Sequence, residues 1–501
     1  MKTVKRKSSI DSDIVIIGSG GAGLAAAAEA SEKGASVIVI EKQRTPGGAT
    51  PFAEGIVAAE SPTQKRMNID VTRDQLFKNH MEYTRWTLNA RLVRALIAKS
   101  GETVDWLEKK GLSFNISGLP AQQPAKNSTA SVIVANPVFH KPPNWGSGII
   151  KTLLKSCHEL GVQIFYQTKA EKLLIDKKGA IKGLVVSKDG AQQTLRTKSI
   201  IIATGGYSSN KEMMRQYCPQ YDVSNIDKLN VRKTHPGDRI RWVGQMHNGD
   251  GIRMAFDIGA ASDGLGILLN SGPNFVAGNH AWILAMRPIA IRVNREGERF
   301  AAENLGPFIS DHAILRQPGQ VMFSIFDDEY KQNIIKNGFG RISGGKYRHE
   351  ASGIEQDLKE AVERGSCFIS DSWKEIAAWI GASPEKLEAT IKEYNSFCEK
   401  GHDDLFVKDP TFLKAIKTPP FYACRSYPGF LVTIGGIKVN ERMEVLNKDN
   451  APISGLYAAG ITTGGWSGST YNISLPGAGC GFPIYGGRIA GENAARFISK
   501  D

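Results

Sequence analysis

The sequence predicts an α/β protein with a Rossmann-like nucleotide-binding unit near its N-terminus. Asp13 to Ile17 is a short apolar strand, and a glycine-rich turn, Gly18 to Gly23, follows it directly. An alanine-rich helix is expected from Leu24 to about Lys33, and a second apolar strand, Ser36 to Ile40, leads to Glu41. A buried strand, a Gly-x-Gly-x-x-Gly turn, a helix and a second strand that ends in an acid are the parts of a dinucleotide-binding βαβ unit.

Each position in this unit has a physical role. Gly18 allows the tight turn, Gly20 lets the backbone approach a pyrophosphate, and Gly23 lets the helix and the strand pack closely. The first turn of the helix, which includes Ala22, offers N–H groups and the positive end of the helix dipole to the phosphates. Glu41 is placed to accept hydrogen bonds from ribose hydroxyls. The unit therefore predicts a bound dinucleotide.

Three further segments favour FAD over NAD as this dinucleotide. Pro46 to Thr50 follows the acid, and its small residues let the chain run beside a ribityl chain and a ring. Val162 to Thr204 has the pattern of short strands joined by two hairpin turns, Lys177 to Ala180 and Lys188 to Ala191. Asn248 to Gly251 then opens another helix.

The chain resembles the succinate dehydrogenase/fumarate reductase flavoprotein superfamily through motifs that occur in one order along nearly its whole length. That superfamily includes soluble fumarate reductases, urocanate reductase and 3-ketosteroid dehydrogenases, and the chain is most similar to the ketosteroid branch. The motifs are Gly-Ser-Gly-Gly-Ala-Gly (18–23), Gly-Gly-Ala-Thr (47–50), Ala-Thr-Gly-Gly (203–206), Gly-Asp-Gly (249–251), Asn-Arg-Glu-Gly-Glu-Arg-Phe (294–300), Gly-Gly (435–436) and Gly-Leu-Tyr-Ala-Ala-Gly (455–460).

The resemblance implies a Rossmann-like FAD-binding domain in two sequence pieces, with an α+β cap domain for the substrate inserted between them. We expect the first piece at residues 10–264, the cap at 265–430 and the second piece at 431–501. No histidine lies within 47–55, so we expect FAD to be bound non-covalently. The residues expected to hold FAD are Gly18, Gly20, Ala22, Gly23, Glu41, Lys42, Gly48, Ala49, Thr50, Gly55, Ala170, Ala203, Gly205, Asp250, Gly460, Ser474 and Leu475.

The C-terminal half contains three landmarks of this expected architecture. Around 374–399, two amphipathic helices are separated by Ala382-Ser383-Pro384. Pro419-Pro420 is expected to lead the chain back from the cap. A last helix is expected to begin after Pro476-Gly477 and to reach Phe497. Its N-terminus would point at the flavin, where the helix dipole stabilises negative charge on the reduced ring.

Four polar anchors of the fumarate-reducing relatives are missing from this chain. Asn270 to Gly272 stands where their cap carries His-Pro-Thr, and Glu303 to Asp311 contains no arginine where they place a catalytic one. Leu431-Val432 stands where a histidine precedes Thr-x-Gly-Gly, and Thr470-Tyr471 replaces an Asn-Arg pair that clamps a carboxylate. These losses argue against fumarate, succinate or urocanate as substrate, although gaps in the comparison leave Arg287 open as a substitute.

Tyr471 is the residue from which we infer the substrate class. Ketosteroid Δ1-dehydrogenases carry a Thr-Tyr pair at this place, and there the tyrosine hydroxyl and a backbone N–H hold the ketone of the substrate. Thr470-Tyr471 matches that pair, while Pro476 to Gly479 lies later than in that family, so the backbone donor is Gly479 or a neighbour. A phenol is a neutral donor suited to a neutral carbonyl, whereas arginine suits a carboxylate. The alternative is a tyrosine that is simply packed.

The second acid or base cannot be chosen from the sequence. Tyr330 belongs to a structural strand end, and the remaining candidates stay equal: His280, Asp311, His312, Tyr207 and Tyr427. Three tryptophans either line an apolar pocket for an alicyclic ring or belong to the core: Trp145, Trp282 and Trp466.

Three functions compete at this stage. The first is an FAD-dependent desaturase of a cyclic ketone, either a 3-oxosteroid or a smaller ring, in which Tyr471 polarises the carbonyl while flavin N5 takes hydride. The second is a fumarate-reductase-like flavin reductase of an enoate or enone C=C bond. The third is a non-catalytic flavin-binding subunit. The sequence identifies neither the direction of the reaction nor the electron acceptor.

Composition narrows the remaining classes of partner. The chain has 501 residues and a formal net charge of +13, with the charges dispersed beyond a basic N-terminal arm and no nucleic-acid motif, so we expect a solvated surface. Six cysteines have no Cys-x-x-Cys pair, which argues against a zinc site or a disulfide framework. No apolar stretch approaches the length of a membrane span, and we expect a cytoplasmic enzyme.

Overall fold

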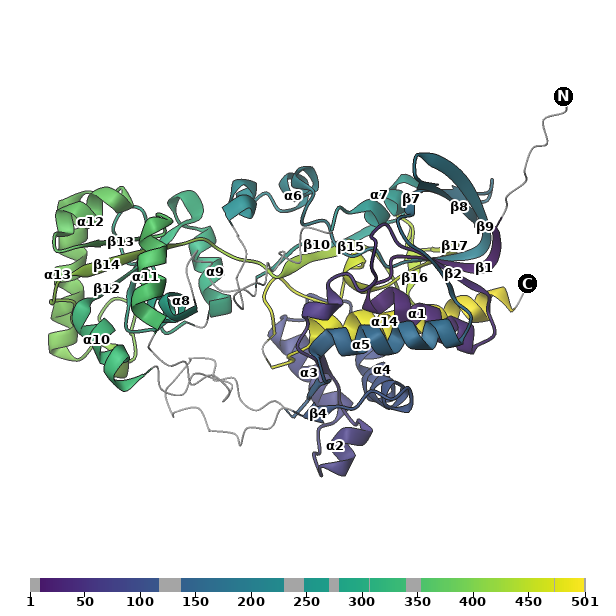
Figure 1. Ribbon diagram of the computed structural model, residues 1–501, viewed down its shortest axis with the longest axis horizontal. Coiled ribbons are helices and arrows are strands. Elements are labelled where there is room, and N and C mark those ends of the chain that lie inside the picture. Colours follow the sequence, from purple (N-terminus) through teal and green to yellow (C-terminus); the bar gives the residue numbers. More distant parts are fainter. Residues whose placement is uncertain are drawn as a thin grey trace.

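A largely parallel sheet lies at the centre of one end of the molecule (Figure 1). The computed structural model describes residues 10–116, 137–228, 247–269, 279–305, 307–338, 353–472 and 474–499. The strand order is β16-β17-β9-β1-β2-β6, and β7 and β8 extend the sheet through antiparallel pairs β7–β8 and β8–β9. The strands are β1 (Ile10–Ile17), β2 (Val37–Ile40), β6 (Gln163–Phe165), β7 (Lys169–Ile175), β8 (Ile181–Lys188), β9 (Ala191–Ile202), β16 (Glu444–Leu446) and β17 (Pro452–Ala458).

The first βαβ unit follows the sequence prediction closely. β1 pairs in parallel with β2 on one side and with β9 on the other, and Ile14 to Ile17 are buried from both faces. Runs of apolar residues without polar alternation are typical of such central parallel strands. Helix α1 (Gly21–Glu32) begins three residues earlier than expected, because the last glycines of the turn already have helical geometry.

The C-terminal helix packs directly on α1. Helix α14 (Ala478–Ile498) contacts α1, and α1 in turn contacts α5 (Trp145–Glu159) (Figure 1). Methyl groups at Gly487 and Gly491 would stand 2.2 and 2.4 Å from the carbonyl oxygens of Ala22 and Ala26. These two glycines therefore allow backbone-to-backbone approach of the helices, which fixes the N-terminal end of α14 relative to the glycine turn.

The other end of the molecule is an α+β unit around a four-stranded antiparallel sheet, β11-β12-β14-β13 (Figure 1). The predicted pair of helices is present, and Ser383 caps the second of them by accepting from the Lys386 N–H at 3.2 Å. The elements of this unit are β11 (Ile291–Val293), β12 (Met322–Asp327), β13 (Cys367–Ser370), β14 (Phe421–Ser426), α8 (Asn279–Met286), α10 (Asp328–Asn337), α11 (Ile354–Glu363), α12 (Trp373–Ile380) and α13 (Pro384–Lys400).

The expected return of the chain at Pro419-Pro420 is wrong. The residues that follow form β14, which pairs with both β12 and β13 and is therefore an inner strand of the cap sheet. The chain returns one strand later, in β15 (Val432–Ile437), which pairs antiparallel with β10 (Ser262–Leu268). A proline pair precedes a strand here because only the strand interior needs every backbone donor.

Shorter elements surround the two ends. A three-stranded sheet, β3-β5-β4, lies beside the helices that follow it. The remaining elements used below are β3 (Ile56–Val57), β4 (Asn115–Ile116), β5 (Phe139–Lys141), α2 (Pro62–Arg66), α3 (Arg73–Tyr83), α4 (Ala90–Lys109), α6 (Lys211–Tyr217), α7 (Asp250–Asp257), α9 (Pro307–Leu315), η1 (Thr50–Phe52) and η7 (Gly460–Thr462). A Rossmann-like α/β domain with an inserted α+β cap confirms the predicted fold class.

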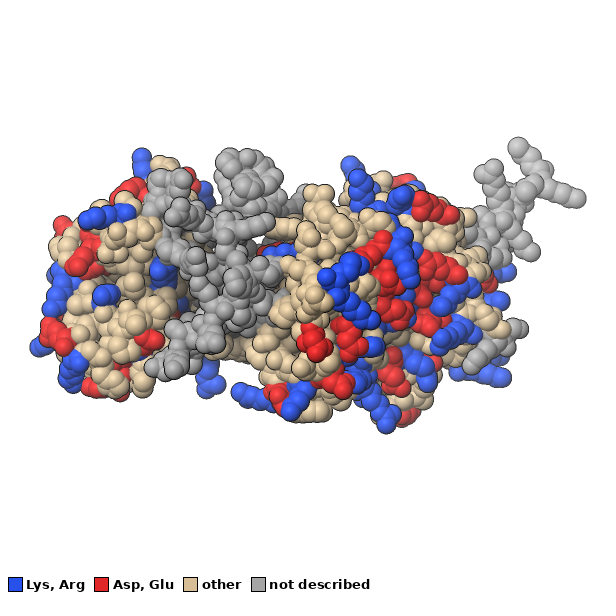
Figure 2. Space-filling view, turned by 90° about the horizontal axis from the view of Figure 1, so that it is seen from below, with Lys and Arg blue, Asp and Glu red and all other residues tan. Residues whose placement is uncertain are grey.

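Charged side chains of both signs are intermixed on the face shown in Figure 2. Among the described side chains on this face, no segregated basic patch stands out, although the chain carries a formal net charge of +13. Across the described ranges, every helix is too short or too polar to cross a membrane.

Candidate active site

The glycine turn after β1 divides into positions that are tightly packed and positions that are open. A methyl group at Gly23 would stand 1.9 Å from the Gly18 carbonyl oxygen, and one at Gly18 would stand 2.4 Å from the Ala203 carbonyl oxygen. By contrast, the nearest atoms to such a group at Gly20 and Gly48 lie 3.8 and 3.6 Å away. The packed pair holds the turn against the sheet, and the open pair leaves a cradle that a pyrophosphate fits.

Helix α1 starts at this cradle without a side-chain cap. The Gly21 N–H donates to Thr50 Oγ1 at 3.0 Å, so the predicted residues Ala49 and Thr50 lie against the helix start. Ala22 lies in the same first turn, and its backbone packs against Gly487 of α14. First-turn amides and the positive end of a helix dipole bind anions, so this end of α1 suits a phosphate.

Glu41 ends β2 with its carboxylate turned toward the glycine turn. Oε2 accepts from the Ser19 backbone N–H at 2.9 Å and from Ser19 Oγ at 2.7 Å, and Oε1 accepts from the Gln43 N–H at 2.8 Å. The side chain is thereby held in one orientation, and a carboxylate still has lone pairs to accept from ribose hydroxyls. Ser19 was missed by the sequence reasoning, although it lies inside the glycine motif.

The far end of the cradle is charged. Lys42 Nζ lies 2.8 Å from Asp250 Oδ2, and Arg253 Nη2 lies 2.9 Å from Asp250 Oδ1. Burial raises the pKa of Asp250, but hydrogen bonding and charge from Lys42, followed by those of Arg253, bring this pKa below its usual value. The carboxylate therefore stays ionised at the start of α7.

His247 is a buried residue of this region that the sequence reasoning missed. Gly205 lies against its ring, because a methyl group at Gly205 would stand 2.8 Å from His247 Cδ2. Burial, with a smaller contribution from Lys42, lowers the pKa of His247 to about 4, so the imidazole is neutral at pH 7. Ala170 and Ala203, the other predicted residues of this end, are buried at 7% and 8% exposure.

The remaining predicted cofactor residues lie where α1, α14 and β3 meet. Gly460, at the start of η7, would place a methyl group 3.0 Å from Ala22 Cβ, and Gly55 would place one 2.4 Å from the His140 carbonyl oxygen. Ser474 and Leu475 form the turn that leads into α14. Residues from both sequence pieces thus converge on the two helix N-termini, which is the arrangement that an extended dinucleotide such as FAD requires.

The resemblance implies that residues 464–479 lie against the flavin, and we call them the flavin-facing segment on that expectation; Tyr471 is its central side chain. The Tyr471 hydroxyl oxygen accepts a hydrogen bond from the Gly477 N–H at 2.8 Å, and its ring packs against Leu268, Val432 and Ile434. Burial raises the pKa of Tyr471 to about 12, so the phenol keeps its proton at pH 7. A phenol that accepts from a backbone amide is oriented to donate that proton to an acceptor.

Gly479 lies in the first turn of α14, directly beyond this contact. Gly477 is the N-cap residue, with φ of +86° and no side-chain cap. A methyl group at Gly479 would meet no atom within 4 Å, so open space borders its backbone. Because the Gly477 N–H is used by Tyr471, the first-turn amide at Gly479 is the better placed backbone donor for a ligand.

Helix α3 holds the flavin-facing segment in place. His80 Nε2–H donates to the Trp466 carbonyl oxygen at 3.0 Å, and His80 Nδ1 accepts from Asn472 Nδ2 at 3.3 Å. The Tyr83 hydroxyl donates to the Tyr471 carbonyl oxygen at 3.0 Å. Burial lowers the pKa of His80, which favours the neutral tautomer that these partners require. No sequence signal pointed to these contacts.

The five acid or base candidates occupy different surroundings. His312, on α9, places Nε2 2.6 Å from Thr470 Oγ1, so it touches the flavin-facing segment. His280 pairs with Asp357 at 3.1 Å within the cap, and Asp311 accepts from the Gly429 N–H at 3.1 Å. Tyr207 is fully buried and donates to the Gly266 carbonyl oxygen, while Tyr427 packs beside the cap core. The sequence had left these five equal, and the structure distinguishes His312.

Two arginines of the cap are engaged in its interior. Arg299, from the Asn-Arg-Glu-Gly-Glu-Arg-Phe motif, contacts Glu303 at 2.9 Å and Asp403 at 2.7 Å with all three side chains buried. Arg292 is buried as well and donates to Ser310 Oγ at 2.7 Å. Neither guanidinium is available to clamp a substrate carboxylate.

Three further positions bear on the polar anchors that the sequence lacks. Arg287, which sequence gaps had left open, follows α8 and is half-buried. Val432 belongs to the apolar group around Tyr471, so a hydrophobic side chain packs at this position. Asn270 to Gly272 lies outside the described residues.

The three tryptophans have different environments. Trp466 is 4% exposed, and its Nε1–H donates to Thr463, so it belongs to the core. Trp145 opens α5 at 50% exposure, and Trp282 on α8 packs beside the cap core. Trp145 is therefore the tryptophan whose ring remains accessible at the surface.

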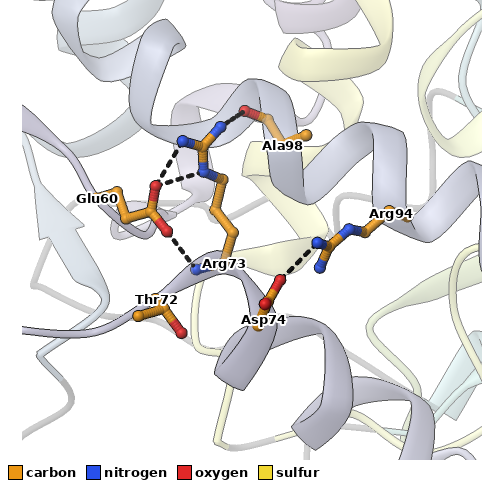
Figure 3. A pocket seen from close by; sticks show the side chains of 6 residues that line it. All are labelled: Glu60, Thr72, Arg73, Asp74, Arg94 and Ala98. Carbon is orange, nitrogen blue, oxygen red and sulfur yellow. Dashed lines mark hydrogen bonds and ion pairs between the residues drawn. The ribbon is translucent and has the colours of Figure 1, made fainter.

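A separate hollow of about 340 Å³ lies between α3 and α4 (Figure 3). Its charged side chains pair with one another: Arg73 Nε donates to Glu60 at 2.6 Å, and Arg94 donates to Asp74 at 2.5 Å. Because these charges neutralise each other in pairs, we assign the hollow no catalytic role.

Comparison with known proteins agrees with this geometry. The family model described as "FAD binding domain" matches residues 13–481. The vinyl phenol reductase of Lactiplantibacillus plantarum is 29% identical over 505 residues, covering 97% of each chain. The open conformation of a flavocytochrome c3 fumarate reductase superposes with a TM-score of 0.68 at 25% identity, over 98% of this chain and 79% of that one.

A ketosteroid enzyme shares the fold at lower identity. The 3-ketosteroid-Δ4-(5α)-dehydrogenase of Rhodococcus jostii RHA1, solved with 4-androstene-3,17-dione, superposes with a TM-score of 0.70 at 24% identity over 98% of both chains. This likeness concerns the fold, whereas the match of the FAD binding domain model confirms the predicted superfamily and its cofactor, FAD.

Proposed function

The chain belongs to the FAD-binding-domain family of flavoproteins, and we propose that it acts on the carbon–carbon bond next to a neutral carbonyl group in a cyclic substrate. It is an FAD-dependent oxidoreductase of the fumarate reductase family whose relatives act on C=C bonds. Within that class, the proposed reaction is the desaturation of a cyclic ketone, either a 3-oxosteroid or a smaller ring.

The single observation that supports this substrate class is the Tyr471–Gly477 contact in the flavin-facing segment. A phenol oriented by a backbone N–H at 2.8 Å stands where the fumarate-reducing relatives use a guanidinium. Arginine matches the two oxygens of a carboxylate, whereas a protonated phenol offers one neutral donor to one carbonyl oxygen. The apolar packing of Val432 and Ile434 around the ring favours an uncharged substrate further.

Each residue has a distinct role in this reaction. Tyr471 donates its hydroxyl proton to the carbonyl oxygen, and the Gly479 N–H supplies a second donor from the first turn of α14. Together they stabilise the negative charge that develops on that oxygen when the neighbouring carbon loses a proton. When bound, FAD supplies the acceptor for the hydride that leaves the next carbon.

The opposite direction is a second candidate function. The vinyl phenol reductase and the fumarate reductases are named as reductases, and the alignment with the vinyl phenol reductase covers 97% of both chains. In that direction the same donors activate an enone or enoate for hydride addition, and a separate electron donor feeds the enzyme. Two hydrogen bonds to the carbonyl lower the barrier in both directions, since the transition state is shared.

The substrate proposal is tested by flavin reduction without turnover. Purified oxidised protein is mixed anaerobically with androst-4-ene-3,17-dione, an oxocyclohexanecarboxylate or succinate, and the flavin absorption band is followed. We expect a cyclic ketone to bleach the band and succinate to leave it unchanged. Bleaching by succinate alone contradicts the proposal.

The direction is tested with reduced protein in the same apparatus. Dithionite-reduced protein is mixed with a cyclic enone and with fumarate, and the return of the flavin band is timed. If the enone reoxidises the reduced flavin faster than the saturated ketone reduces the oxidised flavin, the enzyme is a reductase. If the saturated ketone reduces the oxidised flavin faster, the enzyme is a desaturase.

FAD is proposed to be held without a covalent bond, because no histidine lies within 47–55. Acid precipitation of the protein should release all the yellow colour into the supernatant. Colour that stays with the pellet contradicts this assignment.

A further inference from the structure

We infer that Thr470 and His312 form the proton path to and from the substrate carbon next to the carbonyl. This inference rests on the proposed function, because it names the acid and base of that reaction. Thr470 exchanges a proton with the carbon, and His312 exchanges one with Thr470. Tyr471 keeps a separate role at the carbonyl oxygen.

The geometry of the pair is that of a relay. His312 Nε2 and Thr470 Oγ1 are 2.6 Å apart, a short contact for a hydroxyl and an imidazole. Thr470 directly precedes Tyr471, so the hydroxyl and the phenol belong to neighbouring residues of the flavin-facing segment. The His312 contact therefore reaches the same dipeptide that carries the proposed carbonyl donor.

Thr470 is fixed by backbone pairing. The Leu269 N–H donates to the Ser469 carbonyl oxygen at 2.9 Å, and the Tyr471 N–H donates to the Leu269 carbonyl oxygen at 3.3 Å. These two bonds form a parallel bridge between Leu269 and Thr470. Because Leu269 directly follows β10, this bridge ties the flavin-facing segment to the chain that enters the cap.

His312 is fixed from the other side. Its neighbour Asp311 is fully buried and accepts from the Gly429 N–H at 3.1 Å, which anchors α9 to the chain that leaves the cap. A relay needs both partners to be held, because proton transfer depends steeply on donor–acceptor distance and alignment. Here each partner is held by backbone contacts of its own.

The protonation states of His312 and Tyr471 suit their separate roles. Burial lowers the pKa of His312, so its imidazole is neutral at pH 7 and can accept a proton. Burial raises the pKa of Tyr471 to about 12, so the phenol is a donor and a poor base. The two side chains are therefore suited to different steps.

The proposed step balances in atoms and charge. The bond between the α-carbon and its hydrogen breaks, that proton joins Thr470 Oγ1, and the hydroxyl proton of Thr470 passes to His312 Nε2. The electron pair of the broken bond would form the C=C bond, and FAD, when bound, would supply the acceptor for the hydride of the β-carbon. In the reducing direction the same proton returns from His312 through Thr470.

The alternative role for the pair is purely structural, as a tie between the cap and the flavin-facing segment. A tie affects how well substrate is bound, whereas a relay affects how fast the proton moves. The two are separated by measuring exchange of the α-protons of the ketone in deuterium oxide, using NMR and oxidised holoenzyme. The kcat and KM of each variant are measured alongside.

His312→Gln and Thr470→Val are the informative variants. Glutamine keeps a polar contact to Thr470 but cannot carry a proton, and valine keeps the shape of threonine without its hydroxyl. We expect both to slow α-proton exchange and kcat about 100-fold, with KM changed less than about threefold. Thr470→Ser should recover most of the rate that valine loses. The matched control is His402→Gln, at a side chain that is 60% exposed.

Flavin absorbance and thermal unfolding confirm that each variant is folded and loaded. Wild-type exchange in His312→Gln, or a rise in KM with unchanged kcat, overturns the relay while leaving the carbonyl proposal intact. If wild-type protein neither exchanges α-protons nor reduces its flavin with any ketone, the proposed function itself fails.

Discussion

The glycine turn at Gly18 to Gly23 and the flavin-facing segment around Tyr471 are held by different kinds of contact. In the turn, backbone meets backbone so closely that a methyl group at Gly23 would stand 1.9 Å from a carbonyl oxygen. The flavin-facing segment combines backbone pairing to Leu269 with side-chain hydrogen bonds from α3 and α9, which lie far away in the sequence. A side chain added at Gly18 or Gly23 therefore forces backbone to move, whereas a substitution at Thr470 or Tyr471 changes a side chain that takes no part in such packing.

This difference explains how one fold serves several substrates. The cofactor is the same whatever the substrate is, and the tight packing at Gly18 and Gly23 leaves the cofactor end little freedom. Under the proposed function, the substrate end presents two side chains, Thr470 and Tyr471. In that proposal, a phenol in place of a guanidinium would change the recognised group from a carboxylate to a carbonyl.

The largest effect should come from Gly23→Ala. The added methyl group collides with the Gly18 carbonyl oxygen, and the backbone must separate to admit it. We expect loss of most bound FAD and a destabilisation of about 3 kcal/mol or more. Flavin content after gel filtration and thermal unfolding measure both.

Gly161→Ala is the matched control for this change. Gly161 has φ of +74° and no atom within 4 Å of the added methyl group, so only backbone strain of about 1 kcal/mol is expected there. Full FAD occupancy in Gly23→Ala would show that the cradle is more forgiving than its packing implies.

Acid should destabilise the cofactor end through two buried histidines. Burial lowers the pKa of His140 and of His247 to about 4, below the usual value of 6.5. Between these values the unfolded chain binds protons that the folded chain does not, so stability falls as the pH drops from about 6.5 toward 4. Each histidine contributes a loss of about 3 kcal/mol.

Thermal unfolding at pH 7.5 and pH 5 checks this prediction. His140→Gln should flatten the pH dependence, because the amide can still contact Ser61 but does not titrate in this range. The exposed His402→Gln should leave the slope unchanged. An unchanged slope in His140→Gln would assign the acid sensitivity to other groups.

A smaller effect is expected from His80→Ala, which tests the flavin-facing segment. The substitution removes the contacts to Trp466 and Asn472 and leaves buried partners unsatisfied, for a destabilisation of about 2 kcal/mol. Turnover should fall about tenfold while FAD remains bound, since a small displacement of the segment is enough to misalign Tyr471. His158→Ala, at an exposed position of α5, is the control. FAD loss that parallels the loss of turnover would mean that the two regions are not independent.

The cofactor end could be predicted from sequence because its signals are local. The strand, turn, helix and acid at 13–41 lie within one stretch. Each glycine there meets a requirement of the backbone at its own position. The predicted helix start was three residues late because turn glycines and helix residues overlap at Gly21. The return at Pro419-Pro420 was misplaced because a proline pair can precede a strand as well as end a domain.

Only some residues of the substrate end could be predicted from the sequence. Tyr471 could be found because it lies inside a recognisable segment. His80 was missed and His312 was only one of five equal candidates, because their partners lie 386 and 158 residues away and nothing in the local sequence marks the contact. The displaced Pro476-Gly477 has a structural counterpart: the Gly477 N–H bonds the Tyr471 hydroxyl, and Gly479 borders the open space.

The central claim is that Tyr471 recognises a neutral carbonyl, and the kinetics of Tyr471→Phe test it most directly. With the cyclic ketone that reduces the wild-type flavin fastest, kcat/KM should fall about 100- to 1000-fold while FAD content stays the same. Tyr457→Phe, which removes a buried hydroxyl bonded to the Asn493 carbonyl oxygen, should keep its activity. Wild-type kcat/KM in Tyr471→Phe would contradict the account.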